Sequence, residues 1–198
     1  MIAYPFVGVW KRTVDPTIEP VSVEEVKEQC RIVINADDAQ ISRLIEAARG
    51  QFEEEIGRQV CRATWQLVLD EFPNGGEFIE LPSPPLISVS SIVYTDTDGV
   101  SQTVSPSYYA VSTAWEPGRI RLTYGYSWPS TRDIEEAVTI TYLAGYATAA
   151  EVPANWKHPI RMLVSDAFEN DTANTVIQGG AFVESRLYRA MVNSSRWC

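Results

Sequence analysis

The spacing of apolar side chains divides the chain into two helical stretches with a β-rich stretch between them. Residues 38–56 carry apolar positions three and four apart, which predicts an amphipathic helix. The stripe consists of Ile41, Leu44, Ile45, Ala48, Phe52 and Ile56. A second stripe of this kind consists of Ile160, Leu163, Val164, Ala167 and Phe168. Between them the period changes to two, as at Val138, Ile140 and Tyr142, and alternation of this kind is typical of strands.

Capping residues mark the ends of the helices. Ser22 followed three residues later by Glu25 forms the pattern of a capping box and predicts a short helix from Val23. Asp37 or Asp38 caps the next helix, and Gly57 ends it. Proline is tolerated in the first turn of a helix, so we expect the last regular helix to run from about Pro159, after a tight turn.

Turn signals cut the β-rich stretch into short strands. The expected strands are 64–69, 78–81, 88–94, 108–111, 120–124 and 137–143. Pro-Asn-Gly-Gly at 73–76, Pro-Ser-Pro-Pro at 82–85, Asp-Thr-Asp-Gly at 96–99 and Glu-Pro-Gly at 116–118 separate them. This pattern predicts an antiparallel sheet or small sandwich.

The expected fold class is therefore α+β. Two N-terminal helices and one C-terminal helix form a helical core, residues 21–61 and 151–171. The β subdomain, residues 62–150, is inserted between them. Residues 1–20 are expected as an extended N-terminal arm and residues 172–198 as a C-terminal docking tail.

Aromatic and charged residues at the ends point to contacts with other chains. In the arm, Tyr4, Phe6 and Trp10 either pack back on the body or touch a neighbouring subunit. A Gly-Gly joint at 179–180 precedes a basic, aromatic tail, which is either a docking segment or a helix that closes the protein's own core. The tail residues expected to dock are Phe182, Arg186, Leu187, Tyr188, Arg189, Met191, Arg196 and Trp197.

An acidic run, Glu53, Glu54 and Glu55, lies near the C-terminal end of the long helix, where the helix dipole disfavours negative charge. It is either a solvated face or a set of contacts to a basic surface of a neighbouring subunit. The whole chain of 198 residues has a net charge of −10. This charge argues against general nucleic-acid binding, which requires a basic surface.

No arrangement of residues predicts catalysis, a metal or a cofactor. The single histidine, His158, has no nucleophile motif near it. Cys30, Cys61 and Cys198 lie far apart and predict neither a disulfide framework nor a zinc site. The Asp-x-Asp-Gly at 96–99 lacks the later ligands of a calcium loop. We expect a non-enzymatic protein without a cofactor, a signal peptide or a membrane segment.

Three segments resemble the head–tail connector, or head-completion adaptor, family of tailed bacteriophages and gene transfer agents. The first joins EPVSVEEVK at 19–27 with DDAQISRLIEAAR at 37–49 and EEEIGR at 53–58. The second is FIELPSPPLISVSSIVYTDTDG at 78–99. The third joins ITYLAGY at 140–146 with VPANWKHPIRMLV at 152–164. Their order and spacing carry the resemblance over about residues 19–170.

The resemblance implies a structural virion protein at the head–tail junction, assembled in the host cytoplasm. In this role the chain forms a dodecameric ring beneath the portal protein and extends the DNA channel, so that DNA passes without specific binding. The tail would insert into the portal, and the opposite face would meet a stopper or tail-terminator protein. Catalysis and membrane contact have no part in it.

A ligand-binding module is the alternative. A β-sandwich on a helical base could bind carbohydrate or a virion surface through Trp115, Tyr124, Tyr126 and Trp128. These aromatic side chains would then line one exposed face of the sandwich.

Overall fold

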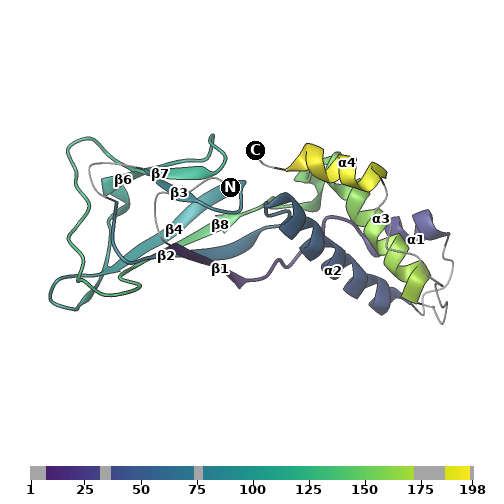
Figure 1. Cartoon of the computed structure of the whole chain (residues 1–198), viewed down its shortest axis with the longest axis horizontal. Coiled ribbons are helices and arrows are strands. Elements are labelled where there is room, and N and C mark those ends of the chain that lie inside the picture. Colours follow the sequence, from purple (N-terminus) through teal and green to yellow (C-terminus); the bar gives the residue numbers. More distant parts are fainter. Residues whose placement is uncertain (1–7, 32–36, 74–77, 172–185, 197–198) are drawn as a thin grey trace. The chain divides into compact units, whose positions relative to one another are not determined.

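The computed structural model describes residues 8–31, 37–73, 78–171 and 186–196. The chain folds into two compact units (Figure 1). The β unit comprises residues up to Thr17 together with Arg62–Gly145, and the helical unit comprises Ile18–Cys61 and Tyr146–Cys198. The α+β class and the insertion of β structure between helical segments are confirmed.

Two antiparallel sheets build the β unit (Figure 1). The larger has the strand order β1-β2-β8-β4-β5 and the smaller has the order β3-β7-β6. The strands are β1 (Gly8–Val14), β2 (Ala63–Leu69), β3 (Ile79–Leu81), β4 (Leu86–Thr95), β5 (Ser101–Thr103), β6 (Tyr109–Ser112), β7 (Gly118–Leu122) and β8 (Val138–Ala144).

Strand β8 is the centre of the larger sheet because it pairs with β2 on one side and β4 on the other. Its side chains alternate between buried and half-buried, as its period-two pattern predicts. Tyr142 is fully buried and its hydroxyl donates to the carbonyl oxygen of Pro82 at 2.9 Å. Residues from both sheets, including Ile79, Ile120 and Ile140, form one apolar core between them.

The helical unit contains α1 (Val23–Cys30), α2 (Asp38–Ile56), α3 (Ala154–Asp171) and α4 (Arg186–Ser195). The capping box at Ser22 is present, with the Glu25 backbone N–H donating to Ser22 Oγ at 3.2 Å. Gly57 ends α2 in the left-handed conformation, with φ of 67°. The predicted stripe of α2 faces α3, where the rings of Phe52 and Trp156 meet edge to face at 6.2 Å.

The last helix begins earlier than the sequence predicts. Helix α3 starts at Ala154 and contains Pro159 inside it, so the expected start at about Pro159 is wrong. Trp156 and Ile160 are both buried in the core, and their packing holds the first turn helical. Pro159 is itself buried, and its fixed φ suits a helix although it cannot donate to the carbonyl four residues earlier.

Two further elements lie in segments that the sequence assigns to the arm and the tail. Gly8–Val14 forms β1, which pairs antiparallel with β2 from Gly8 opposite Leu69 to Val14 opposite Thr64. Residues 186–195 form α4, which contacts α2 and α3. The chain passes between the units after Thr17, Cys61 and Gly145, whereas the sequence-based bounds lie at residues 20, 61 and 150.

Candidate functional site

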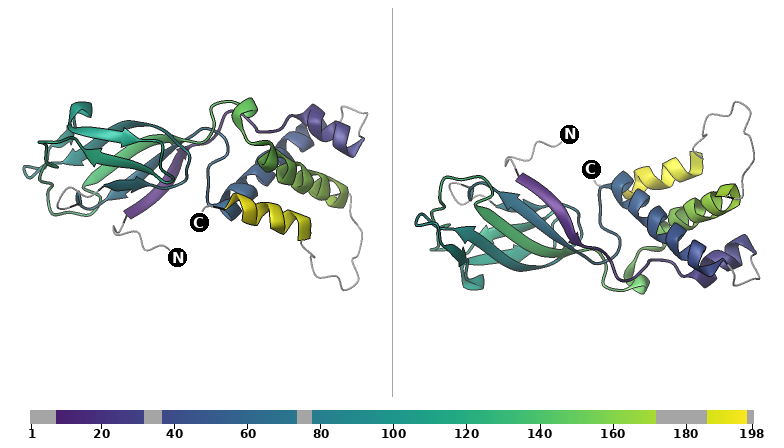
Figure 2. Two further views of the ribbon diagram at one scale, coloured as in Figure 1. Left: turned by 90° about the horizontal axis from the view of Figure 1, so that it is seen from above. Right: turned by 90° about the horizontal axis from the view of Figure 1, so that it is seen from below.

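The C-terminal helix α4 carries the described part of the predicted docking tail. It lies beside α2 and α3 within the helical unit (Figure 2). Val192 is 3% exposed and belongs to the helical core, and Arg196 Nε donates to the carbonyl oxygen of Glu55 at 2.8 Å. Arg189 and Arg196 are exposed. The helix thus helps close the core of its own chain and also leaves two basic side chains exposed.

The other predicted portal-binding residues are not placed by the structure. Phe182 and Trp197 lie outside the described residues, as do the side chains of Arg186, Leu187, Tyr188 and Met191. Tyr4 and Phe6 of the predicted subunit contacts also lie outside them. Trp10 is described, in β1, and is 46% exposed. Portal binding by the tail and subunit contacts by the arm stay predictions.

The acidic run near the end of α2 does not lie on one solvated face. Glu54 is exposed and Glu55 is half-buried, but Glu53 is only 7% exposed. Because α2 turns Glu53 toward the interior, the expectation that its side chain is displayed with the other two needs correction. Contacts of Glu54 and Glu55 to a neighbouring subunit remain a prediction.

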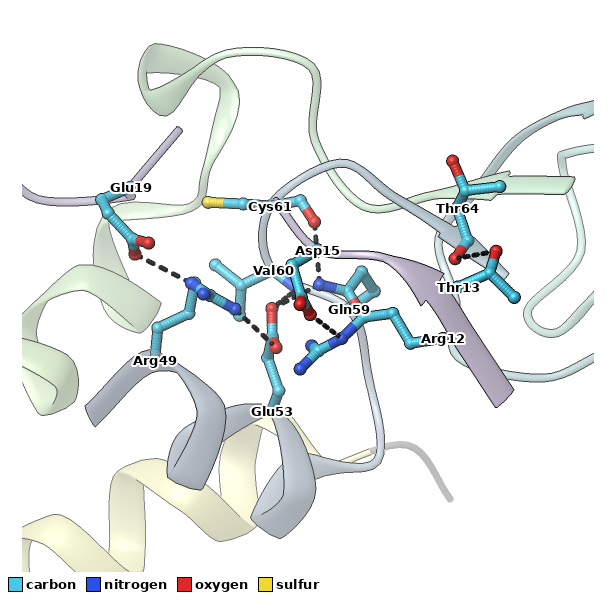
Figure 3. A network of polar contacts seen from close by, with 10 residues as sticks. All are labelled: Arg12, Thr13, Asp15, Glu19, Arg49, Glu53, Gln59, Val60, Cys61 and Thr64. Carbon is cyan, nitrogen blue, oxygen red and sulfur yellow. Dashed lines mark hydrogen bonds and ion pairs between the residues drawn. The ribbon is translucent and has the colours of Figure 1, made fainter. Parts of the chain in front are cut away.

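Glu53 is the centre of a buried polar network (Figure 3). Its Oε2 accepts from Arg49 Nη1 at 3.0 Å, one helical turn earlier. Its Oε1 accepts from Gln59 Nε2 at 2.6 Å and from the Val60 backbone N–H at 3.0 Å. The carboxylate therefore satisfies both a buried cation and a buried backbone donor.

Arg49 extends the network to the segment that enters the helical unit. Arg49 is 3% exposed and its Nε donates to Glu19 Oε2 at 2.8 Å. Burial by itself would lower the pKa of the Arg49 guanidinium, but the hydrogen bond to Glu19 and the charges of Glu53 and Glu19 outweigh it and raise that pKa. Arg49 is thus a paired, permanently charged group inside the unit.

Cys61 lies at the edge of the same network. Gln59 Nε2 donates to its carbonyl oxygen at 2.8 Å, and its side chain is fully buried. Burial, reinforced by the negative charge of Glu19, raises the pKa of the Cys61 thiol to about 12. A thiol with this pKa is a poor nucleophile at neutral pH, so Cys61 has a packing role.

The network holds the segments at which the chain enters and leaves the helical unit against helix α2. Glu19 follows the first crossing at Thr17, and residues 59–61 precede the crossing at Cys61. The Tyr146 backbone N–H, just after the third crossing, donates to the Val60 carbonyl at 3.0 Å. All of these segments are joined to α2 through Arg49 and Glu53. The four-residue spacing of Arg49 and Glu53 beside Phe52 is the sequence signal that could have indicated this pair.

The aromatic side chains of the alternative binding module have mixed exposure. Trp115 is 58% exposed, Tyr124 is 101% exposed and Tyr126 is 45% exposed. Trp128 is half-buried and stacks on Phe72 with centroids 4.7 Å apart, as part of the β core. Three of the four side chains therefore remain accessible to a ligand.

No group of three or more metal-ligating side chains occurs among the described residues. Nor does any helix in the described part of the chain have the length and apolar character needed to span a membrane. His158 lies half-buried in the first part of α3.

Comparison with known proteins supports the resemblance seen in the sequence. The model of the family described as "Phage gp6-like head-tail connector protein" matches residues 20–114. A search of curated proteins finds no match. The resemblance to the head–tail connector family of phages and gene transfer agents (GTAs) is thereby confirmed.

Solved structures of GTA particles contain chains with the same fold. A chain in the neck of an empty GTA particle, computed with C6 symmetry, matches with a TM-score of 0.73 and 18% identity over 95% of both chains. A chain in the neck of a native GTA particle, computed with C12 symmetry, matches with a TM-score of 0.73 and 18% identity over 95% of this chain and 94% of the other. A chain in the virion of a native GTA particle matches with a TM-score of 0.72 and 18% identity over 95% of both chains.

Proposed function

We propose that this protein, which has the family match and the fold of a head–tail connector, is a structural adaptor of the head–tail junction in a virion. The observation that carries the proposal is the agreement of two comparisons: a connector family matches residues 20–114, and neck chains of GTA particles share the fold over 95% of the chain. Its role is mechanical joining, without catalysis.

In this role the chain forms a ring, of twelve copies, beneath the portal protein. The C6 and C12 symmetries used for the matching necks support a ring of this size. DNA passes through its channel without being held, because a chain of net charge −10 offers no general basic surface to phosphates. The side away from the portal meets a stopper or tail-terminator protein.

The tail reaches the portal through its exposed basic side chains. Since Val192 is buried in the helical core, α4 can remain in place while Arg189 and Arg196 stay exposed, the latter also bound through Nε to the Glu55 carbonyl. Arginine is well suited to pair with carboxylates at such an interface. Deleting the whole tail would remove Val192 from the core, so a point variant is the sharper test.

Electron microscopy of virions tests the proposed location. We expect a ring of this chain at the head–tail junction; its absence from that position would refute the adaptor role. The portal contact is tested by measuring how much portal protein co-purifies with the Arg189→Glu variant of this chain. Arg43→Glu makes the same charge change at an exposed position of α2 and serves as the control. Equal recovery of portal with both variants would argue against the tail contact.

A ligand-binding module is the second candidate function, because Trp115, Tyr124 and Tyr126 remain exposed. Exposed aromatic rings stack on sugars and on other partners alike. Glycan-array binding that is lost in Trp115→Ala would support this function. No binding above background by the wild-type chain would remove it.

A further inference from the structure

Strand β1 is an edge strand that the described part of its own chain leaves largely uncovered. It lies at one end of the larger sheet and, among the described strands, pairs only with β2 (Figure 2). All its residues after Gly8 are exposed, on both faces of the sheet, including Val9 at 65%, Trp10 at 46% and Val14 at 54%. Lys11 and Arg12 interrupt the apolar side chains of this edge, and its register with β2 is irregular between Arg12 and Val14. The stretch Gly8–Trp10 is therefore the part of β1 best suited to pair with another chain.

The opposite margin of the same sheet has an open place for a strand. Strand β4 has ten residues, but β5 has three and pairs only with Val93, Tyr94 and Thr95. In the described part of the chain, the first half of β4, Leu86–Ser91, pairs with β8 and with no strand on its other side. This part of β4 contains no charged residue and no proline, which commonly protect edges from pairing, although its register with β8 is irregular between Leu86 and Ser88 and between Val89 and Ser91.

The strand directions allow β1 of a second copy to pair antiparallel with β4. Each neighbouring pair in the order β1-β2-β8-β4-β5 is antiparallel, so β1 and β5 run in the same direction and both run opposite to β4. A β1 strand from a second copy can therefore continue the line of β5 along β4, antiparallel to it. Across the sheet, β5 lies in register with Gly8 and Val9 of the same chain. Because β5 already occupies that end of β4, a β1 strand from another copy must bind further along β4, toward Leu86.

We propose that β1 of one copy adds to the free edge of β4, at Leu86–Ser91, of the next copy. The contact joins two different surfaces, and such head-to-tail contacts generate rings when the rotation closes. Backbone hydrogen bonds supply the pairing, and burial of Val9 and Trp10 supplies apolar area. The inference rests on the proposed ring and names the surfaces that hold it together.

Disulfide trapping tests this pairing in assembled particles. Lys11→Cys is combined with Ser88→Cys in one variant and with Ser90→Cys in another, in a background with Cys30→Ser and Cys198→Ser. Within one chain Lys11 is three strand spacings from Ser91, about 14 Å, which exceeds the reach of a disulfide. A bond formed by either double variant therefore joins two copies.

We expect a ladder of covalent multimers on a non-reducing gel for at least one double variant. Lys11→Cys alone and Lys11→Cys with Asp98→Cys, whose second cysteine lies outside the free edge, serve as controls and should remain monomeric. Monomers from both test variants, in particles whose ring is visible by microscopy, would overturn the pairing. So would dimers from Lys11→Cys alone, because they indicate contact between two β1 strands.

A charge inserted into β1 provides a second test that needs no crosslink. Val9→Asp should lower the amount of chain incorporated into particles by at least tenfold, while Val111→Asp, the same change at an exposed site on the smaller sheet, should leave it unaltered. Equal incorporation of both would contradict the proposal. If wild-type particles contain no ring of this chain, the adaptor function itself fails; a ring that tolerates Val9→Asp removes only the β1 contact.

Discussion

Removing the Glu53 carboxylate should destabilise the helical unit strongly. In Glu53→Ala, Arg49 at 3% exposure loses its second carboxylate, and the amide of Gln59 and the N–H of Val60 lose their acceptor. Breaking a buried ion pair by removing one partner costs about 3–5 kcal/mol. Because Arg49 keeps Glu19, whose side chain is 30% exposed, we expect the lower end, about 3 kcal/mol.

Urea unfolding followed by circular dichroism at 222 nm measures this loss, since helical signal reports the helical unit. In thermal unfolding of a chain of this length, the same loss of 3 kcal/mol corresponds to a decrease of about 6–12 °C in Tm. Glu54→Ala is the matched control: the same change at the next, exposed position should stay within about 0.5 kcal/mol of wild type.

A double-mutant cycle isolates the pair itself. Arg49→Met with Glu53→Gln should cost less than the sum of the two single changes, because each single change leaves the other group buried without its ionic partner. Glu53→Ala that unfolds like Glu54→Ala, or strictly additive effects in the cycle, would refute the role assigned to the network.

Three further changes probe other parts of the helical unit. Phe52→Ala removes a fully buried ring packed on α3 and should cost about 3–5 kcal/mol in urea unfolding; a loss below 1 kcal/mol would contradict its place in the core. Ser22→Ala should lower the free energy of unfolding by about 1 kcal/mol because the helix cap is lost, whereas Ser42→Ala, inside α2, should change it little. Equal losses in the two variants would show that the cap contributes nothing specific. Cys61, whose folded pKa is raised to about 12 from 9.0, should resist iodoacetamide at pH 8, so rapid alkylation of the native thiol would contradict its burial. Since only the unfolded thiol ionises between those pKa values, wild type should lose about 1 kcal/mol relative to Cys61→Ala from pH 8 to pH 10, and parallel pH profiles would argue against the shift.

The sequence determined the elements whose signals are local. The stripe of α2, its end at Gly57 and the capping box at Ser22 follow from spacing and side-chain type within a few residues, and the structure has all of them. The ends of the six expected strands lie within two residues of those observed, because turn residues and the alternating pattern mark where each strand begins and ends. The connector resemblance also came from such segments.

Only the tertiary structure decided the features that depend on distant partners. Strand β1 has no alternating pattern because both its faces are exposed, and pairing with β2, fifty or more residues later, makes it a strand. Glu53 looks like its neighbours in an acidic run, yet the fold brings Arg49, Gln59 and Val60 to its carboxylate. The local spacing of residues indicates on which face of a helix or strand a side chain lies. Which group that side chain contacts depends on the tertiary structure, because its partners come from distant parts of the chain.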